Sequence, residues 1–186
     1  MPKVYQIKIT IKKDKIWRRV QIPLSYTFWD LHIIVCDMME WWGSLYHYFQ
    51  IVTKSKTKYV ESFPDLRNID TTVEVSWNTL VKKYLPLKTN KISYVYHGFD
   101  EFICEITLEK TLNQVKDKPY PNYMAGNKTV PFEIENLHLT YLPPGPKEEI
   151  FDVKKIMFTG TLKALYIHKS KLIDSCYGNY YHTQFF

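Results

Sequence analysis

Hydrophobic and polar residues alternate along the start of the chain, as they do in strands that bury one face and expose the other. The alternating apolar residues are Tyr5, Ile7, Ile9 and Ile11, followed after a polar break by Ile16, Val20 and Ile22. The polar break, Lys12–Lys15, predicts the turn of a hairpin. Pro23 has no backbone N–H for a strand ladder, so it predicts the end of the second strand.

A capped amphipathic helix is predicted directly after this hairpin. Thr27 is suited to the N-cap, and Asp30, three residues later, supplies the acidic partner of a capping box. The apolar residues that recur at helical spacing are Phe28, Leu31, Val35, Met38 and Met39. Asp30, Asp37 and Glu40 lie off this stripe, so one face of the helix is expected to be buried. The order strand, strand, helix is a beginning shared with ubiquitin-like folds.

The middle of the chain predicts more strands. Tyr46–Thr53 is aromatic and β-branched enough for a third strand, whereas Lys54–Thr72 lacks periodicity and indicates a loop. Both periods mix in Val73–Leu85, which favours a short strand and then a helical turn or two around residues 77–84. The clearest hairpin joins Ile92–Tyr96 to Phe102–Glu109.

The length of 186 residues suits one domain with a tail. We expect an α+β domain over residues 1–142 and a divergent C-terminal segment over residues 143–186, because Leu142–Pro146 has the composition of a linker. The apolar content of 45% argues against a disordered chain. No apolar run approaches the roughly 18 residues of a spanning helix, and no signal-peptide pattern is present. These patterns predict an intracellular protein, cytoplasmic or nuclear, without a membrane partner.

Motifs that carry metal, cofactor or nucleophilic chemistry are missing. Cys36, Cys104 and Cys176 are widely spaced and form no Cys-x-x-Cys pair, which favours neither a zinc ribbon nor a disulfide framework. The chain also contains no Gly-rich phosphate loop, no His-Glu-x-x-His and no Gly-x-Ser-x-Gly element. We therefore predict no metal site and no cofactor.

An ordered series of residues resembles the plasmid pRiA4b open-reading-frame-three-like family, many of whose members are passengers of transposable elements. The series comprises Tyr5–Thr10, Ile16–Pro23, Leu31-His32, Trp41, His47-x-Phe49, Tyr94-x-Tyr96, Leu108–Lys110, Tyr120-Pro121 and Ala125-Gly126. The resemblance covers roughly residues 3–141 and implies an α+β domain with a mixed sheet and packed helices.

The polar positions of the family pattern are the ones that this chain alters. Where the family usually has Tyr-Asp-Phe-Gly-Asp followed by Trp and His, this chain has Tyr96–Asp100 with a different order, then Phe102 and Cys104. The family's cysteines are replaced, Tyr123 and Val130 standing at two of their positions, and its paired histidines become Leu45 and His47. Tyrosine, valine and leucine do not replace thiolate or imidazole ligands. The resemblance therefore implies a scaffold kept for binding after its polar site was lost.

Basic residues gather in the first hairpin of a chain whose formal net charge is +6. The predicted nucleic-acid-binding residues are Lys8, Lys12, Lys13, Lys15, Arg18 and Arg19. Such cations can track phosphates, and Trp17, if exposed, can stack on a base. Basic residues on a strand edge also prevent unwanted edge pairing, and Trp17 also fits a core position.

These observations favour a non-catalytic binding module of mobile-element ancestry that contacts nucleic acid through the basic hairpin. A protein-interaction module that uses a β-edge is one alternative. A hydrolase-like or metal-dependent enzyme is the other, with weak catalytic candidates in His47, His97, Asp100 and Glu109. The sequence leaves the oligomeric state open.

Overall fold

The computed structural model describes residues 1–39, 41, 47–61, 73–86, 91–97 and 101–128. Its elements are β1 (Lys3–Ile11), β2 (Ile16–Pro23), α1 (Phe28–Met39), β3 (His47–Val52), β4 (Thr57–Glu61), β5 (Val73–Val75), the 3-10 turn η1 (Val81–Lys83), β6 (Lys91–His97), β7 (Glu101–Asn113) and β8 (Asn122–Gly126). The chain divides into two compact units, Met1–Val153 and Lys154–Phe186, and all described residues belong to the first. The predicted boundary at residue 142 lies outside the described residues.

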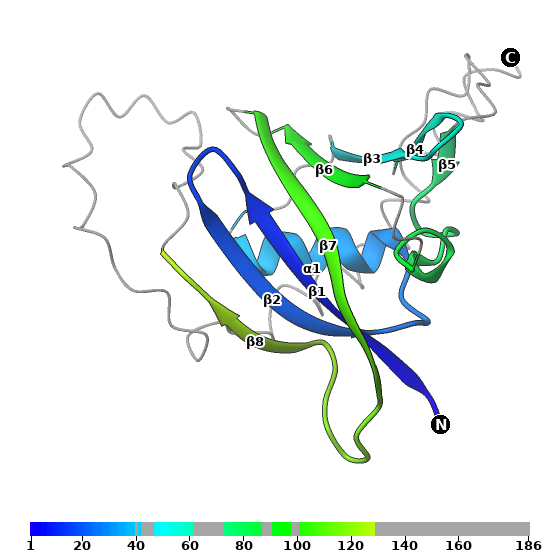
Figure 1. The fold of residues 1–186 in the computed structure, drawn as a ribbon, viewed down its shortest axis with the longest axis vertical. Coiled ribbons are helices and arrows are strands. Elements are labelled where there is room, and N and C mark those ends of the chain that lie inside the picture. Colours follow the sequence, from blue (N-terminus) through cyan, green and yellow to red (C-terminus); the bar gives the residue numbers. More distant parts are fainter. Residues whose placement is uncertain (40, 42–46, 62–72, 87–90, 98–100, 129–186) are drawn as a thin grey trace, which may run out of the picture. The chain divides into compact units, whose positions relative to one another are not determined.

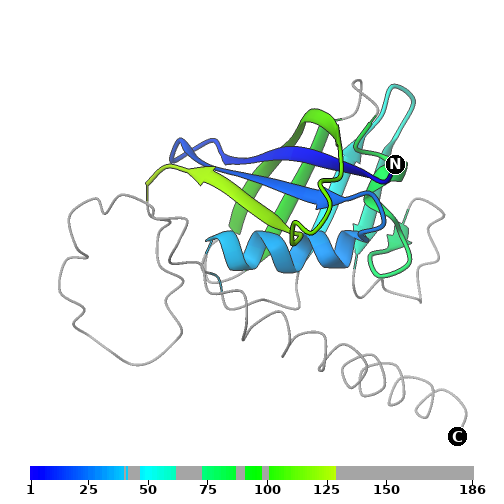
Figure 2. The ribbon, with the colours of Figure 1, turned by 90° about the horizontal axis from the view of Figure 1, so that it is seen from below.

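All eight described strands form one sheet in the order β5-β4-β3-β6-β7-β1-β2-β8. Only β4 and β5 pair in parallel, so the sheet is mixed. The strands curve around α1, which lies against one face (Figure 2). The predicted α+β class with a mixed sheet is therefore confirmed, although the described residues contain one α-helix rather than several. The ubiquitin-like character of the beginning stays a prediction.

The predicted first hairpin and its turn are confirmed. β1 and β2 pair antiparallel from Val4↔Pro23 to Ile11↔Ile16, and the second strand ends at Pro23. Lys15 N–H donates to the Lys12 carbonyl over 3.3 Å, and Lys15 has a φ of 56°. Ile7, Ile9, Val20 and Ile22 are fully buried, as the alternation requires.

The predicted capping box of α1 is also confirmed. The backbone N–H of Asp30 donates to Thr27 Oγ1 over 3.2 Å, and the backbone N–H of Thr27 donates to Asp30 Oδ2 over 2.7 Å. Two further N–H groups at this helix end, from Phe28 and Trp29, donate to the carbonyls of Thr79 and Ser76. The segment after β5 thus covers the helix start, which explains why Asp30, expected off the buried stripe, is only 8% exposed.

Two strands were not foreseen. The prediction of a loop over residues 54–72 is wrong at β4, where Val60 is the only buried residue and the alternation is too weak to recognise. β4 pairs with β3 from Tyr48↔Glu61 to Val52↔Thr57. This pairing, rather than a local sequence pattern, makes the segment a strand. β8 is equally short, and every residue in it is half-buried or exposed. The predicted third strand, the short strand at 73–75 and the hairpin of β6 and β7 are confirmed.

Candidate nucleic-acid interface

The sheet face that points away from α1 carries three residues of the predicted interface. Lys8 on β1 lies opposite Arg19 on β2. Trp17 precedes Arg19 by two residues on β2 and therefore lies on the same face of the sheet. Lys8 Nζ lies 5.1 Å and Arg19 Cζ lies 5.0 Å from the centre of the half-buried Trp17 ring. Two cation–π contacts therefore join this aromatic ring to basic side chains.

Arg19 also forms a bidentate ion pair with Glu109 on β7. Its Nε donates to Glu109 Oε2 over 2.6 Å, and its Nη2 donates to Glu109 Oε1 over 2.7 Å. These hydrogen bonds hold the pKa of the Glu109 carboxyl below its usual range, and Gln6 Nε2 contributes a bond of 2.9 Å. The positive charge of Arg19 is thus largely compensated, and the guanidinium is oriented by its partners.

Arg18 occupies the opposite face of the same strand and is completely buried. Its guanidinium donates to the carbonyls of Met38 (2.9 Å), Trp17 (3.0 Å), Asn127 (2.5 Å) and Lys128 (3.0 Å). The Met38 carbonyl belongs to the last turn of α1, where a cation is favourable. Arg18 therefore ties the helix end to the segment after β8, and this placement removes it from the surface that a phosphate reaches.

The hairpin turn contributes the remaining cations. Lys12 forms an ion pair with Glu105 on β7, whereas Lys13 and Lys15 are exposed. Asn127 braces this end of the hairpin, since its side chain accepts from the Trp17 N–H over 2.8 Å and donates to the Lys15 carbonyl over 2.9 Å. Lys8, Lys13 and Lys15 are therefore the predicted residues whose positive charge is available to an incoming anion.

The four weak catalytic candidates are not brought together among the described residues. His47 on β3 is 5% exposed and faces α1, whereas Glu109 faces the other side of the sheet and is bound to Arg19. His97 ends β6, where its backbone pairs with Glu101, and Asp100 lies outside the described residues. His47 and Glu109 cannot act on one substrate atom from opposite faces of a sheet.

His47 instead belongs to a buried polar cluster under α1. Its ring stacks on that of His32 with centroids 3.5 Å apart and planes inclined by 1°. His32 Nδ1 lies 2.7 Å from Tyr94 Oη and 3.6 Å from Cys36 Sγ. Burial, and then the neighbouring His47, lower the pKa of His32 well below its usual value, so the ring is neutral.

Sequence reasoning missed this cluster because a lone histidine on an apolar helix face is typical of a core residue. The available signal was the resemblance itself, since Leu31-His32, His47-x-Phe49 and Tyr94-x-Tyr96 supply three of its members. Among the described residues, no group of three or more histidine, cysteine or acidic side chains is arranged to hold a metal ion. Burial raises the pKa of the Cys104 thiol to about 12, which makes it a poor nucleophile.

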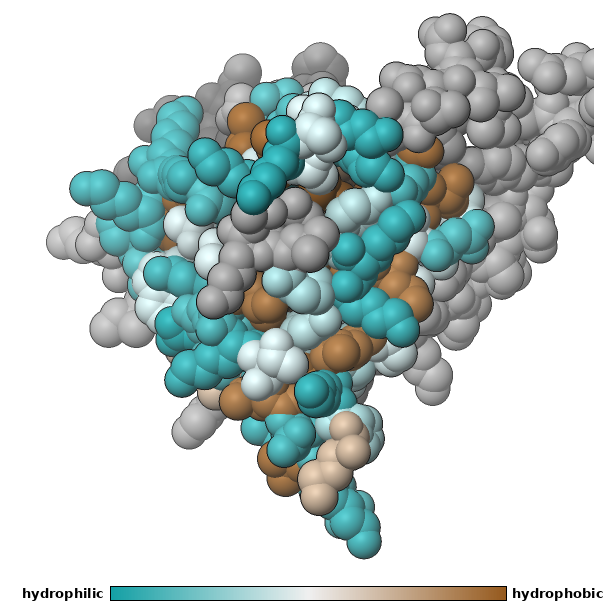
Figure 3. All heavy atoms as spheres, turned by 45° about the vertical axis from the view of Figure 1, so that its right-hand side comes forward, coloured by the Kyte–Doolittle hydropathy of each residue, from teal (hydrophilic) through white to brown (hydrophobic). Residues whose placement is uncertain are grey.

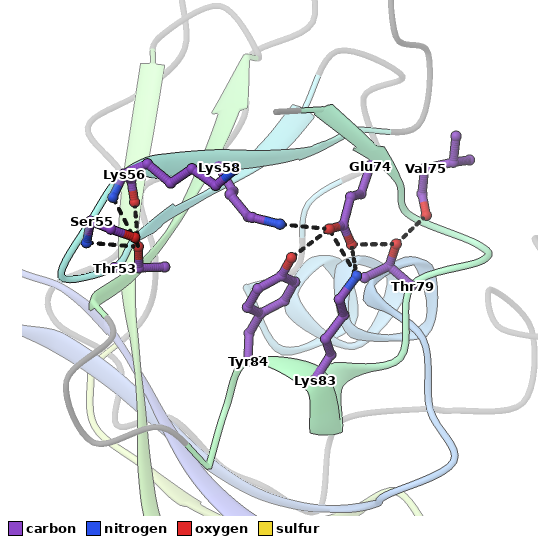
Figure 4. A network of polar contacts seen from close by, with 9 residues as sticks. All are labelled: Thr53, Ser55, Lys56, Lys58, Glu74, Val75, Thr79, Lys83 and Tyr84. Atoms are coloured by element: carbon purple, nitrogen blue, oxygen red, sulfur yellow. Dashed lines mark hydrogen bonds and ion pairs between the residues drawn. The ribbon is translucent and has the colours of Figure 1, made fainter. Parts of the chain in front are cut away.

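A second polar network fastens η1 to β4 and β5. Figure 4 shows Lys58, Lys83 and Tyr84 converging on the Glu74 carboxylate, with distances of 3.2, 2.8 and 2.5 Å. Burial opposes ionisation of Glu74, but hydrogen bonds from Lys83, Tyr84 and Lys58 outweigh it and lower its pKa to about 2. Every acceptor oxygen of this carboxylate is engaged, so the network stabilises the fold and leaves little for a ligand.

Comparison with known proteins agrees with the fold. The profile of the plasmid pRiA4b ORF-3-like protein family matches residues 3–135. A crystal structure of a protein of unknown function from Methanosarcina mazei Go1 is similar with a TM-score of 0.61 and 27% sequence identity. The similarity covers 70% of this chain and 72% of that one. A comparison with curated proteins finds no match. Within the described part of the chain, no helix combines the length and the apolar content that a membrane crossing requires.

Proposed function

This chain belongs to the plasmid pRiA4b ORF-3-like family, and we propose that it is a non-catalytic binding module whose hairpin β1–β2 contacts nucleic acid. The observation that carries the proposal is the half-buried Trp17 ring, contacted by Lys8 and Arg19, on the face of the sheet opposite α1. An aromatic ring flanked by cations suits a base next to its phosphates. Descent from a mobile element, which the family resemblance suggests, is part of the same proposal.

The lysines whose charge is available to phosphates define the proposed nucleic-acid contact. Lys13 and Lys15 extend from the turn, and Lys8 continues the same basic surface toward Trp17. Phosphate contacts from such lysines carry no sequence information, and base stacking on Trp17 tolerates any base. Stacking requires an unpaired base, so a single strand is the preferred ligand and sequence preference is weak.

The alternatives receive less support from the geometry. An enzyme built on His47 and Glu109 would need groups that lie on opposite faces of the sheet. A protein contact through the edge of the first hairpin meets two occupied edges, since β1 pairs with β7 and β2 pairs with β8. α1 covers one face of the hairpin (Figure 2), whereas on the other face Lys8 and Trp17 are half-buried and Lys13 and Lys15 at the turn are exposed.

Charge removal at matched positions tests the proposal. Lys8, Lys13 and Lys15 are replaced by glutamine in one variant, and Lys54, Lys56 and Lys82, three lysines exposed elsewhere, are replaced in the control. The probe is a fluorescently labelled oligothymidylate single strand, titrated with the full chain at low salt. The hairpin variant should bind at least roughly tenfold more weakly than the control, because each lost phosphate contact weakens binding. Equal affinities of the two variants, or an unmodified protein that does not bind at micromolar concentration, would refute the proposal.

A further inference from the structure

Strand β7 is longer than the strand that pairs with it on one side. β6 and β7 pair from His97↔Glu101 to Ile92↔Ile106, but β7 runs on to Asn113. Over residues 107–113, β7 has β1 on one side and no described strand on the other (Figure 1). Alternate backbone N–H and C=O groups of this stretch therefore point to an edge that no described strand occupies.

A groove of about 610 Å³ runs along this edge. Its apolar lining residues are Leu85, Pro86, Ile92, Ile106 and Leu108. Charged and polar residues of β6 and β7 form the rest of the lining, among them Lys91 and Lys110. Figure 3 shows that hydrophilic and hydrophobic residues are interspersed over the side of the molecule it presents, without one broad apolar patch. Such a surface suits a narrow ligand better than a large apolar interface.

The charges at the groove are unequally compensated. Its two carboxylates are engaged, Glu105 with Lys12 and Glu109 with Arg19. Lys91 and Lys110 are exposed and make no ion pair with a described residue. Among the described residues, the groove thus presents two positive charges without a carboxylate partner, beside apolar lining residues and a strand edge that is not paired.

We infer that this groove binds an extended acidic peptide of a partner protein, which adds as a strand along residues 107–113 of β7. Main-chain hydrogen bonds to the open edge give affinity, and alternate side chains give specificity. Apolar side chains of the peptide pack toward Leu85, Ile92 and Leu108, and its carboxylates reach Lys91 and Lys110. The stretch is about 23 Å long at roughly 3.3 Å per residue, enough for a peptide of about six residues.

This inference is independent of nucleic-acid binding. The groove lies along β6 and β7, whereas the proposed nucleic-acid contact uses Lys8, Lys13, Lys15 and Trp17 on the first hairpin. The lysines replaced to test nucleic-acid binding, Lys8, Lys13 and Lys15, differ from Lys91 and Lys110 of the groove, so either proposal can fail while the other holds.

A charge-swap experiment with defined peptides tests the inference. The probes are labelled, end-capped hexapeptides with alternating Glu and Val or with alternating Lys and Val, titrated against the full chain. We expect the Glu/Val peptide to bind the unmodified protein and to bind Lys91→Glu/Lys110→Glu at least roughly tenfold more weakly, since two attractions become repulsions. The Lys/Val peptide should show the opposite preference. Lys54→Glu/Lys56→Glu carries the same charge change in the turn between β3 and β4 and should behave as the unmodified protein.

A backbone-blocked probe separates strand addition from simple charge attraction. N-methylation of alternate residues of the Glu/Val peptide removes donors of the strand ladder and should abolish binding in one of the two possible phasings. Equal binding of the Glu/Val and Lys/Val peptides, or full binding by both N-methylated forms, would overturn the inference. So would a concentration-dependent dimer that Lys91→Glu/Lys110→Glu dissociates, because the edge would then be occupied by a second copy. Unchanged thermal melts of the variants verify that both fold.

Discussion

Arg19 and Glu109 join two strands that do not pair with each other. Arg19 lies on β2 and Glu109 on β7, with β1 between them, and the two Arg19–Glu109 hydrogen bonds of 2.6 and 2.7 Å span that strand. The register of β1 against β7 shifts between Gln6 and Ile7, and Glu109 is the extra residue of β7 at this bulge. The sheet thus places a carboxylate inside its most basic surface, where it restrains Arg19.

Replacing Glu109 with glutamine should strengthen nucleic-acid binding. The substitution releases Arg19 for phosphate contact and removes a negative charge from the surface, so the slope of log K against log salt should steepen by roughly 0.7 to 0.9. Oligonucleotide titrations at several salt concentrations measure this slope. Glu61→Gln, which removes a carboxylate from β4, is the matched control and should leave the slope as it is. Weaker binding by Glu109→Gln would mean that Arg19 needs its partner to bind.

Replacing Arg18 with glutamine should cost far more stability than replacing Arg19. Arg18 is completely buried and satisfies carbonyls from α1, β2 and the segment after β8, so its loss should lower the free energy of unfolding by about 3 to 5 kcal/mol. Arg19→Gln breaks a partly exposed pair and should cost about 1 kcal/mol or less. Denaturant unfolding of both variants gives the comparison. The reverse order would mean that Arg18 is not the buried anchor described here.

The buried His32 should make the protein less stable in acid. The pKa of His32 is lowered in the folded state, so below about pH 6.5 the unfolded chain takes up a proton that the folded ring refuses, and stability falls as the pH decreases. One such proton corresponds to a slope of about 1.4 kcal/mol per pH unit.

The difference in unfolding free energy between the unmodified protein and His32→Phe, followed over pH, isolates this effect. Burial raises the pKa of Asp37 to about 6. This shift changes stability with pH in the opposite direction, because stability is lost as the pH rises from near 4 to 6. This contribution is present in both proteins and cancels in their difference. Unfolding free energies between pH 5 and 7.5 should depend less on pH in the variant. Parallel pH profiles would show that His32 does not titrate as described.

The helix residues at positions 30 and 31 should differ in their contribution to stability. Leu31 is fully buried between α1 and the sheet, so Leu31→Ala should lower the free energy of unfolding by about 2 to 5 kcal/mol. Asp30→Ala removes the capping box and should cost about 0.5 to 2 kcal/mol. Denaturant melts provide both values. A larger loss for Asp30→Ala would mean that the cap, rather than the apolar stripe, controls the helix.

Periodicity predicted the parts of the fold that bury one face of a regular element. The first hairpin and the pair β6–β7 have this property, and their patterns were recognised. The helix α1 was also recognised, but eleven of its twelve residues are buried, so the prediction that it buries only one face is wrong. β4 and β8 lie beside longer strands and bury little, so their structure depends on partners distant in sequence. Such partners leave no local pattern.

The candidate site could be predicted only in part from the sequence, for a related reason. Charge alone put Arg18 with Arg19, although the alternation of Ile16, Val20 and Ile22 already assigns residue 18 to the buried face. The compensation of Arg19 by Glu109 joins residues 90 positions apart, and that of Lys12 by Glu105 is similarly distant. The cluster of His32 and Tyr94 spans 62 positions, so the fold had to be known before the contact could be seen.

The salt dependence of oligonucleotide affinity tests the central claim most directly. Lys8, Lys13 and Lys15 are the cations available to phosphates, so log K for a single strand should fall with log salt with a slope near −2 and no steeper than about −3. The experiment is a titration of a labelled oligothymidylate with the full chain at salt concentrations between roughly 50 and 200 mM. A slope in that range, with tighter binding of the single strand than of a duplex of equal length, is the predicted result. A slope near zero, or no micromolar binding at the lowest salt, would contradict nucleic-acid recognition by this hairpin.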